Sequence, residues 1–330
     1  MGIKSNNRRE SYYNYFGDSG LDAEAIHPYP LTSLWYGNRG LWGGGKQTGG
    51  SVISQIDYVA IDTTGNAADF GDLTQSRDYS AGLSDSHRGV FGGGVSSGSY
   101  INIIDYVLFS TLGDASDFGD LTQSRGSPTS ASNTTRGLWA GGYGDGSPVP
   151  TSGSDYIDYI TIATLGDATD FGNTIISKMS SSGGCANATR AVFYSGYDGV
   201  TSSNTDNIDY VTIATPGNAS DFGNAFEARR GLGGASNTTR GVFFGGKTGS
   251  NTNTIDYVTI ATLGNGTDFG SLTYSTQGCA SCANGTRAVT AGGQYYVNTM
   301  DYVTIANTGN ATDFGDLDIG RYGPGACSGD

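Results

Sequence analysis

The amino-acid sequence predicts an all-β protein and, within that class, a six-bladed β-propeller with four-stranded blades, terminal-strand closure and a non-repeat N-terminal arm. Three observations predict this fold. Two short sequence blocks each occur six times along the chain. The blocks alternate apolar and polar residues, as half-buried strands do. The two ends of the chain carry complementary parts of one repeat. We expect the arm to cover residues 1–37 and the propeller to cover residues 38–330.

The composition is typical of a globular β protein with many turns. Glycine makes up 55 of the 330 residues, about twice its usual share. Only 15% of the residues are charged, and 21 tyrosines and 13 phenylalanines argue against intrinsic disorder. The net charge of −14 argues against nucleic acid as a partner. No apolar run reaches the ~18 residues of a membrane span, and the N-terminus lacks the apolar core of a signal peptide, so we expect neither membrane insertion nor secretion.

The first strand of each unit is a run of small residues such as Gly233–Asn237. An equivalent run, Gly325–Asp330, ends the chain without the arginine-containing block that follows it elsewhere. Conversely, the first arginine-containing block, at Asn38 and Arg39, has no small-residue run directly before it. We therefore expect the C-terminal run to complete the unit that begins at Asn38, which removes the unpaired sheet edges of an open ring.

The second strand is expected in a block that begins with arginine and ends in small residues, such as RGVFFGG at 240–246. Apolar or aromatic residues follow the arginine, and the closing glycines predict a turn. The recurring arginines are Arg39, Arg88, Arg136, Arg190, Arg240 and Arg287.

A block of 16 residues, which reads IDYVTIATPGNASDFG at 208–223, supplies the third and fourth strands. Its first half alternates β-branched residues, its Gly-Asn or Gly-Asp pair predicts a turn, and Asp-Phe-Gly begins the last strand. Successive copies start 48, 53, 51, 47 and 45 residues apart, which is the spacing of propeller blades. The aspartates of the Asp-Tyr pairs are Asp57, Asp105, Asp158, Asp209, Asp256 and Asp301.

The repeated aspartates and arginines have two interpretations, a ring of metal sites or a set of structural joints. We favour the joints, because an active site does not usually occur in six equal copies, whereas a joint between units must. Each aspartate would then hold a turn or pair with one of the repeated arginines, since a guanidinium group can bind a carboxylate through two hydrogen bonds.

The four cysteines predict neither a disulfide framework nor a metal site. Cys279 and Cys282 form a C-x-x-C pair, but zinc would need two further ligands at suitable spacing. Three of the cysteines share one repeat position with leucine and alanine, which predicts buried thiols. We expect no metal and no cofactor. The residues at this position are Leu83, Ala131, Cys185, Ala235, Cys282 and Cys327.

The segments between the second and third strands differ in length and sequence from unit to unit, and we name them the variable loops. Tyrosines among small polar residues give contact area at low entropic cost, and loops on a rigid scaffold often carry recognition. The alternative is that they are solvated turns under no constraint. The loops are Lys46–Gln55, Val95–Ile103, Tyr143–Tyr156, Tyr197–Asn207, Lys247–Thr254 and Gln294–Thr299. Their candidate binding residues are Tyr100, Tyr143, Tyr156, Tyr197, Tyr295 and Tyr296.

The N-terminal arm is unusually aromatic for a disordered tail. One interpretation is that it docks on a partner, and the other is that it folds back across one face of the propeller. We expect docking. The candidate anchors are Tyr12, Tyr13, Tyr15, Phe16, Trp35 and Tyr36.

The arginine–aromatic–Gly-Gly block, the Tyr-containing strand and the later aromatic residue resemble Kelch repeats over residues 38–330. The sequence departs from that pattern by placing the phenylalanine of Asp-Phe-Gly where Kelch repeats have tryptophan. The longer string IDYVTIATxGNATDFGDLTxxR is similar to repeats in proteins of bacteriophages of marine bacteria. That resemblance implies a virion structural protein, made in the host cytoplasm and located in the extracellular particle.

We therefore expect a non-enzymatic structural or adhesion module of a bacteriophage, such as a fibre, decoration or tail-associated protein. Its arm would dock to other virion proteins in a multimeric assembly, and its loops would face a host glycan or protein. Two alternatives stay open. One is a carbohydrate-active enzyme, which needs only two carboxylates. The other is a cellular Kelch-like protein-interaction scaffold.

Overall fold

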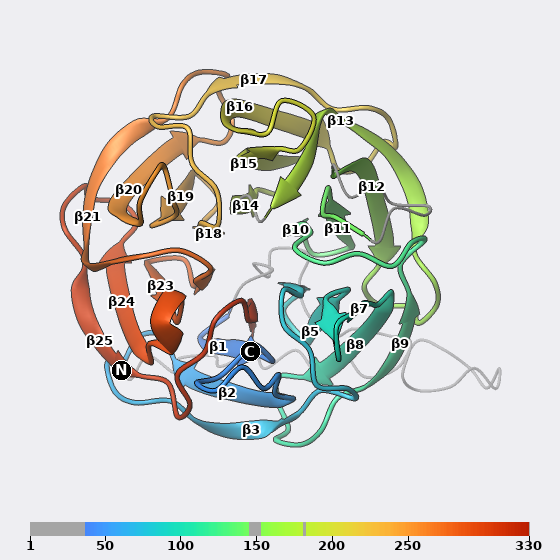
Figure 1. The fold of residues 1–330 in the computed structure, drawn as a ribbon, viewed down its shortest axis with the longest axis vertical. Helices are drawn as coiled ribbons and strands as arrows, with labels where there is room; N and C mark the ends of the chain where they lie inside the picture. The colour runs from blue at the N-terminus through green and yellow to red at the C-terminus, as the bar shows by residue number, and fades with distance from the viewer. Residues whose placement is uncertain (1–36, 145–152, 181–182, 330) are drawn as a thin grey trace, which may run out of the picture. The chain divides into compact units, whose positions relative to one another are not determined.

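The computed structural model describes residues 37–144, 153–180 and 183–329 (Figure 1). Its named elements are antiparallel strands, apart from a single 3-10 turn, Gln294–Tyr296. The all-β class is therefore confirmed. Within the described ranges, no helix is long and apolar enough to cross a membrane. The predicted arm anchors Tyr12, Tyr13, Tyr15, Phe16, Trp35 and Tyr36 lie outside these residues.

Four of the sheets contain four strands each. The first comprises β26 (Gly325–Gly329), β1 (Arg39–Gly43), β2 (Gln55–Ala60) and β3 (Ala68–Asp72). The second comprises β4 (Ala81–Ser84), β5 (Arg88–Gly92), β8 (Ile103–Leu108) and β9 (Ser116–Asp120). The third comprises β18 (Gly233–Ser236), β19 (Arg240–Phe244), β20 (Thr252–Thr259) and β21 (Thr267–Thr276). The fourth comprises β22 (Ala280–Ala283), β23 (Arg287–Ala291), β24 (Thr299–Thr304) and β25 (Thr312–Asp316).

Two further units join into one eight-stranded sheet, a feature the sequence did not predict. They join because β13 and β15 extend beyond their counterparts, so that Lys178 pairs with Asp198. A short ribbon of β6 (Val95–Ser96) and β7 (Ser99–Tyr100) was also not predicted. The strands of the joined units are β10 (Thr129–Ser132), β11 (Arg136–Ala140), β12 (Ser154–Thr161), β13 (Thr169–Ser180), β14 (Gly183–Ala186), β15 (Arg190–Asp198), β16 (Ser203–Thr212) and β17 (Ser220–Asn224).

The repeated residues fill the core of each unit. In β2, Ile56, Asp57 and Val59 are buried, whereas Ala60 at the end of the strand is exposed. Tyr58 packs edge-to-face on Phe70 of the neighbouring strand, with ring centroids 5.9 Å apart. The same pair recurs in every copy of the block. The Tyr of Asp-Tyr and the Phe of Asp-Phe-Gly are therefore core contacts.

The first strands of the units contact one another in a closed cycle, from β26 through β4, β10, β14, β18 and β22 back to β26. The outer strands β3, β9, β13, β17, β21 and β25 lie at the periphery (Figure 1). The predicted pairing of the two chain ends is confirmed, because β26 pairs with β1 and Cys327 stands opposite Leu41.

Each outer strand is covered by the turn that joins the third and fourth strands of the next unit. Gly113 and Ala115 donate their backbone N–H groups to the carbonyls of Phe70 and Asp72 at 2.9 and 2.7 Å. Equivalent bonds occur at all six outer strands, and Gly65 closes the cycle by donating to Phe314. These turns satisfy backbone groups that an edge strand would otherwise leave open to pairing with another chain.

Candidate functional site

The two ends of the strands form two distinct surfaces, because all pairings within the units are antiparallel. We name as the turn face the turns that join first to second and third to fourth strands. We name as the loop face the variable loops together with the connections that lead from each outer strand to the next first strand. The variable loops and connections pair with each other, as in the bridges of Asp78 with Val95 and of Lys46 with Tyr322.

The repeated aspartates are buried. Of the two roles expected for them, pairing with the second-strand arginines is wrong, whereas Asp105 does hold a connection, since it accepts a hydrogen bond from the backbone N–H of Thr74 at 3.0 Å. Asp105 pairs with Arg77 at 2.7 Å and Asp158 pairs with Arg125 at 3.0 Å, not with arginines of the second strand. Burial lowers the pKa of both guanidinium groups, and the facing carboxylates oppose that shift. In each of these ion pairs, the basic residue stands six residues after the glycine of the Asp-Phe-Gly motif that precedes it. The remaining pairs are Asp57–Arg321, Asp209–Lys178 and Asp256–Arg229.

The arginines of the second strands form a different joint. Arg88 lies 5.3 Å from the ring centroid of Tyr106 and donates to the carbonyl of Ile162 in the next unit at 2.9 Å. Such stacking on a tyrosine face is a cation–π contact. Arg39, Arg88, Arg136, Arg190, Arg240 and Arg287 all make this pair of contacts, each to the tyrosine of its own unit and to a carbonyl of the next.

One joint departs from the others. Asp301 is fully buried, but the cation position opposite it holds Thr276, and no ion pair to Asp301 is found among the described residues. Asp301 instead accepts hydrogen bonds from the backbone N–H and hydroxyl of Thr273, both at 2.8 Å. Nearby, the hydroxyl of Tyr274 donates to backbone carbonyls. Burial raises the pKa of Asp301, and the charge of Asp313 raises it further.

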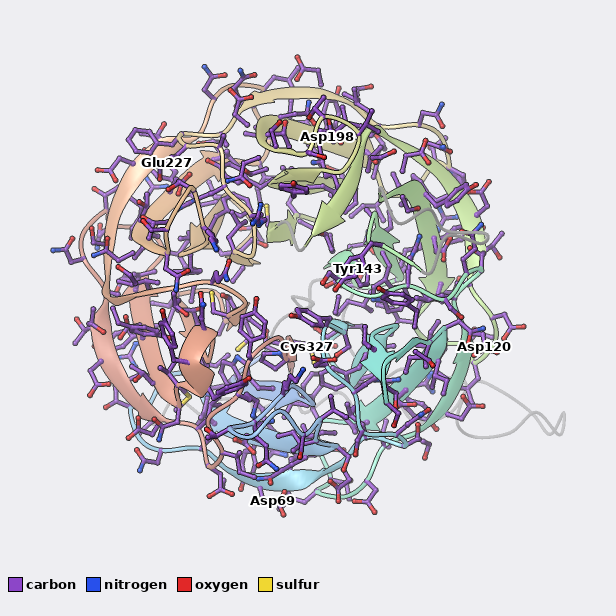
Figure 2. All side chains as sticks on the ribbon, viewed as in Figure 1. Asp69, Asp120, Tyr143, Asp198, Glu227 and Cys327 are labelled. Atoms are coloured by element: carbon purple, nitrogen blue, oxygen red, sulfur yellow. The ribbon has the colours of Figure 1, made fainter. Side chains whose placement is uncertain are left out.

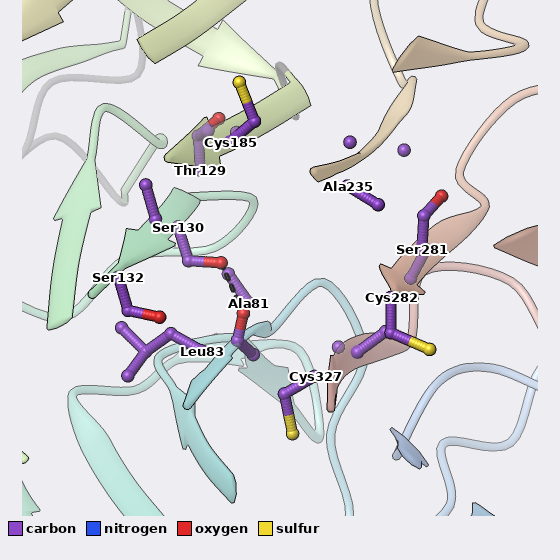
Figure 3. Close-up of a pocket in the computed structure, with 18 of the residues that line it drawn as sticks. Ala81, Leu83, Thr129, Ser130, Ser132, Cys185, Ala235, Ser281, Cys282 and Cys327 are labelled. Atoms are coloured by element: carbon purple, nitrogen blue, oxygen red, sulfur yellow. Dashed lines mark hydrogen bonds between the residues drawn. The ribbon is translucent and has the colours of Figure 1, made fainter. Parts of the chain in front are cut away.

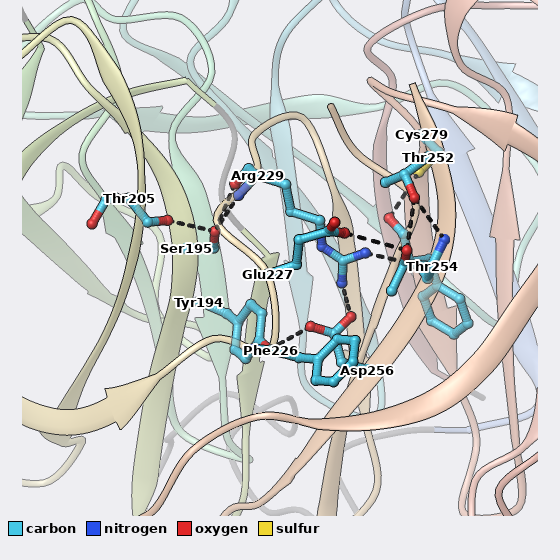
Figure 4. A network of polar contacts seen from close by, with 11 residues as sticks. Tyr194, Ser195, Thr205, Phe226, Glu227, Arg229, Thr252, Thr254, Asp256 and Cys279 are labelled. Atoms are coloured by element: carbon cyan, nitrogen blue, oxygen red, sulfur yellow. Dashed lines mark hydrogen bonds and ion pairs between the residues drawn. The ribbon is translucent and has the colours of Figure 1, made fainter. Parts of the chain in front are cut away.

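A second variation surrounds Asp256 (Figure 4). The hydroxyl of Tyr194 donates to this carboxylate, and the Tyr194 ring stacks on Phe243 at 3.9 Å. Arg229 binds the same carboxylate, and burial lowers its pKa to about 10. The network joins neighbouring units through groups that are fully or nearly buried, so we assign it a structural role.

The first strands line a central pocket of about 140 Å³ (Figure 3). Several wall hydroxyls tie adjacent strands together, since Ser132 donates to the carbonyl of Ser84 at 2.7 Å and Ser328 donates to that of Ala283 at 2.6 Å. The thiols of Cys185, Cys282 and Cys327 point away from the pocket.

The predicted burial of the cysteines is confirmed. All four are free and buried, and burial raises the pKa of each thiol. The aliphatic residues at the same repeat position, Leu83, Ala131 and Ala235, are buried too. Within residues 37–144, 153–180 and 183–329, no group of three or more potential metal ligands occurs.

The six predicted tyrosines do not form one cluster. Tyr100 and Tyr143 pack edge-to-face at 5.3 Å, and Figure 2 shows Tyr143 facing the centre of the ring of sheets. Tyr197 lies under Arg230, whose guanidinium carbon is 4.5 Å from the ring centroid. Tyr295 and Tyr296 lie on the 3-10 turn, where Tyr295 is 78% exposed. Tyr156 is half-buried on β12.

Several residues of the connections were not predicted from the sequence. Tyr79 and Tyr322 pack edge-to-face at 5.5 Å, and Asp78 lies beside them with an exposed fraction of 3%. Burial raises the pKa of Asp78 to about 6, although the charge of Lys46 opposes the shift. The signal that could have found these residues is variability, because the position after the joint cation, or after Thr276 in its place, holds a different residue in each of the six units: aspartate, glycine, methionine, arginine, glutamine and tyrosine.

The sequence comparisons assign no family to this chain. No protein-family model matches the chain, and no curated protein matches its sequence.

Proposed function

We propose that residues 38–330 form a closed six-bladed β-propeller of the Kelch-like kind. The proposal is supported by the cycle of contacts among the first strands, by the cycle of turns over the outer strands, and by the pairing of β26 with β1. The eight-stranded sheet then corresponds to two blades that β13 and β15 connect at their ends.

We infer that this scaffold is a non-enzymatic binding module that uses its loop face. The observation that supports this inference most directly is the contrast between the turn face and the loop face. On the turn face, equivalent side chains make equivalent hydrogen bonds, since Asp114 accepts from the backbone of Asp72 at 3.0 Å and Asn218 accepts from that of Asn173 at 3.1 Å. The loop face varies from unit to unit and carries two packed tyrosine pairs, Tyr79 with Tyr322 and Tyr100 with Tyr143. Variation on a rigid frame is how scaffolds carry recognition.

We further propose that the module belongs to a bacteriophage virion, with the N-terminal arm docking to other virion proteins. The support is the similarity of the repeated string to repeats of bacteriophage proteins. In this arrangement the loop face is presented to a host surface, and the described blades serve as a spacer of fixed geometry.

The test compares matched pairs of variants on the two faces. Tyr100→Ser with Tyr143→Ser alters the loop face, whereas Leu112→Ser with Leu165→Ser alters turn residues that are 53% and 51% exposed. We expect both proteins to fold and to enter purified particles, but only the loop-face variant to reduce adsorption of the particles to their host bacteria. Absence of the chain from particles would overturn the virion assignment, and equal adsorption of both variants would overturn the role of the loop face.

A further inference from the structure

The connections that lead from each outer strand to the next first strand meet at the loop-face end of the central pocket. There the backbone N–H of Tyr79 donates to Gly323 at 2.7 Å, and that of Ser127 donates to Tyr79 at 2.8 Å. Gly278 and Gly323 continue this chain of backbone hydrogen bonds to Gly231. The connections therefore form a partial belt around the mouth of the pocket.

The belt has a left-handed backbone at the same position of five connections. The φ angles there are 70° at Gly231, 69° at Gly278 and 65° at Gly323. Glycine adopts this conformation freely, whereas a side chain makes it costly. Tyr79, with a φ of 55°, and Ser127, with a φ of 53°, nevertheless occupy the same position. Because strained residues concentrate where a protein binds or reacts, a bulky aromatic side chain kept at this position points to a role in binding.

The residues on either side of Tyr79 carry unusual polar groups. The Asp78 carboxyl is 3% exposed and faces Lys46, without an ion pair to it among the described residues. The Ser80 hydroxyl is 7% exposed, lines the central pocket and has no hydrogen-bond partner in the described part of the chain. Buried polar groups normally find partners, so an unpartnered hydroxyl that lines a pocket points to a missing ligand or water.

Two further tyrosines complete the mouth. Tyr322 packs on Tyr79. Tyr143 lies close by, since its backbone pairs with that of Gly126, whose neighbour Ser127 donates to the carbonyl of Tyr79. Burial raises the pKa of all three tyrosines, and the charge of Asp78 raises it further. The mouth thus combines aromatic rings, hydroxyl groups and an acidic group.

We propose that Asp78, Tyr79 and Ser80, with Tyr143 and Tyr322, form a saccharide-binding site at the loop-face mouth of the central pocket. This inference rests on the proposed binding role of the loop face and names its ligand class. A sugar ring presents apolar C–H faces that suit tyrosine rings, and hydroxyls that suit a carboxylate and a serine hydroxyl, each able to take part in several hydrogen bonds. The pocket of about 140 Å³ below can admit a small substituent of the sugar.

The site is suited to binding and not to hydrolysis. Glycoside hydrolysis ordinarily needs two carboxyl groups on opposite sides of the scissile bond. Of the five residues assigned to the site, only Asp78 carries a carboxyl group. We therefore expect bound oligosaccharides to be recovered intact.

The experiment begins with the full chain on an array of defined neutral and acidic oligosaccharides, followed by calorimetric titration with the oligosaccharide that gives the strongest signal. Tyr79→Gly is the central variant. It removes the ring and relieves the left-handed strain, so we expect a melting temperature at or above that of the unaltered chain, with at least about a tenfold loss of affinity. Asp78→Asn, which nearly preserves shape, should cause a similar loss.

Leu112→Ser is the control, because Leu112 lies on the turn face and is 53% exposed. It should leave both the melting temperature and the affinity nearly unchanged. The inference is overturned if no oligosaccharide binds, if Tyr79→Gly and Asp78→Asn bind as well as the unaltered chain, or if the bound oligosaccharide is cleaved.

The outcomes also separate this inference from the broader proposal. If no oligosaccharide binds but Tyr100→Ser with Tyr143→Ser still reduces particle adsorption, the loop face binds a protein and the saccharide site is wrong. If neither binding nor adsorption depends on the loop face, both proposals fail.

Discussion

At Gly119, the glycine of one Asp-Phe-Gly motif, the neighbouring unit comes so close that any side chain would collide with it. A Cβ atom there would lie 2.5 Å from the backbone carbonyl of Gly166, and the φ angle is 145°. The same approach occurs at the glycine of every copy of the motif. The motif therefore combines a core phenylalanine with a glycine that lets the next turn cover the outer strand.

Gly119→Ala should destabilise the protein more than Gly113→Ala. Gly113 has a φ of 151° with open space around its Cβ position, so its substitution reports the backbone cost alone, about 1–3 kcal/mol. Gly119→Ala adds the collision with Gly166 and should cost at least about 2 kcal/mol more. Chemical denaturation of both variants measures the difference, and equal losses would show that the next turn can move away without cost.

The buried joints allow a comparison between an aspartate with a cation and one without. Asp105→Asn leaves the fully buried Arg77 without its countercharge and should cost about 3–5 kcal/mol. Asp301→Asn removes a buried charge that has no cation opposite it, so we expect a distinctly smaller loss at pH 7. Denaturation midpoints of the two variants give the answer, and a larger loss for Asp301→Asn would contradict this account of the joints.

The joint at Asp301 should also make stability depend on pH. Its pKa is raised in the folded chain above the ordinary value of 3.8, so the folded state holds a proton more tightly than the unfolded state. The proton on Asp301 therefore stabilises the fold fully at pH values below 3.8, and this stabilisation is lost as the pH rises through the raised pKa. As the pH rises through this window, the free energy of unfolding of the unaltered chain should fall relative to that of Asp301→Asn.

At the scale of elements, the strands could be predicted because their alternation and turns recur in every unit. The joint arginines stand at the end of the repeated string, but alternation does not show which of the two arginine columns faces the aspartates, and Lys178 and Thr276 interrupt this one. The pairing of β13 with β15 depends on how far each strand extends, which local alternation does not specify. Tyr79 and Tyr322 were missed for a related reason, since they belong to connections whose sequences differ.

Strand β26 offers a direct test of closure. A chain that ends at Pro324 loses β26, which leaves β1 with an unpaired edge and exposes the apolar side chain of Leu41. We expect its melting temperature to fall by about 10 °C or more, together with increased aggregation. A chain that ends at Gly329 keeps the strand and serves as the control. An unchanged melting temperature after the longer truncation would rule out a stabilising closure.

At the scale of the whole molecule, cohesion comes from three cyclic sets of contacts: the first strands, the second-strand arginines and the turns over the outer strands. None of these contacts uses a disulfide, because all four cysteines are free.

We therefore expect neither a chelator nor a reductant to change the melting temperature of the full chain. Scanning calorimetry with EDTA and with a thiol reductant, each against untreated protein, measures this. A large fall with either reagent would show that the Cys279 and Cys282 pair had been dismissed wrongly.

The pairing of β26 with β1 also sets the order in which the molecule can be completed. The break in the chain falls inside one sheet, between its first and second strands, and not between two sheets. Ribosomes make β1, β2 and β3 before the strands of the other sheets, so this sheet receives β26 only after the other sheets have been synthesised. A prematurely terminated polypeptide leaves this sheet unfinished, however many of the others it has built. Pairing of β26 with β1 thereby acts as a check that synthesis has passed through every other sheet.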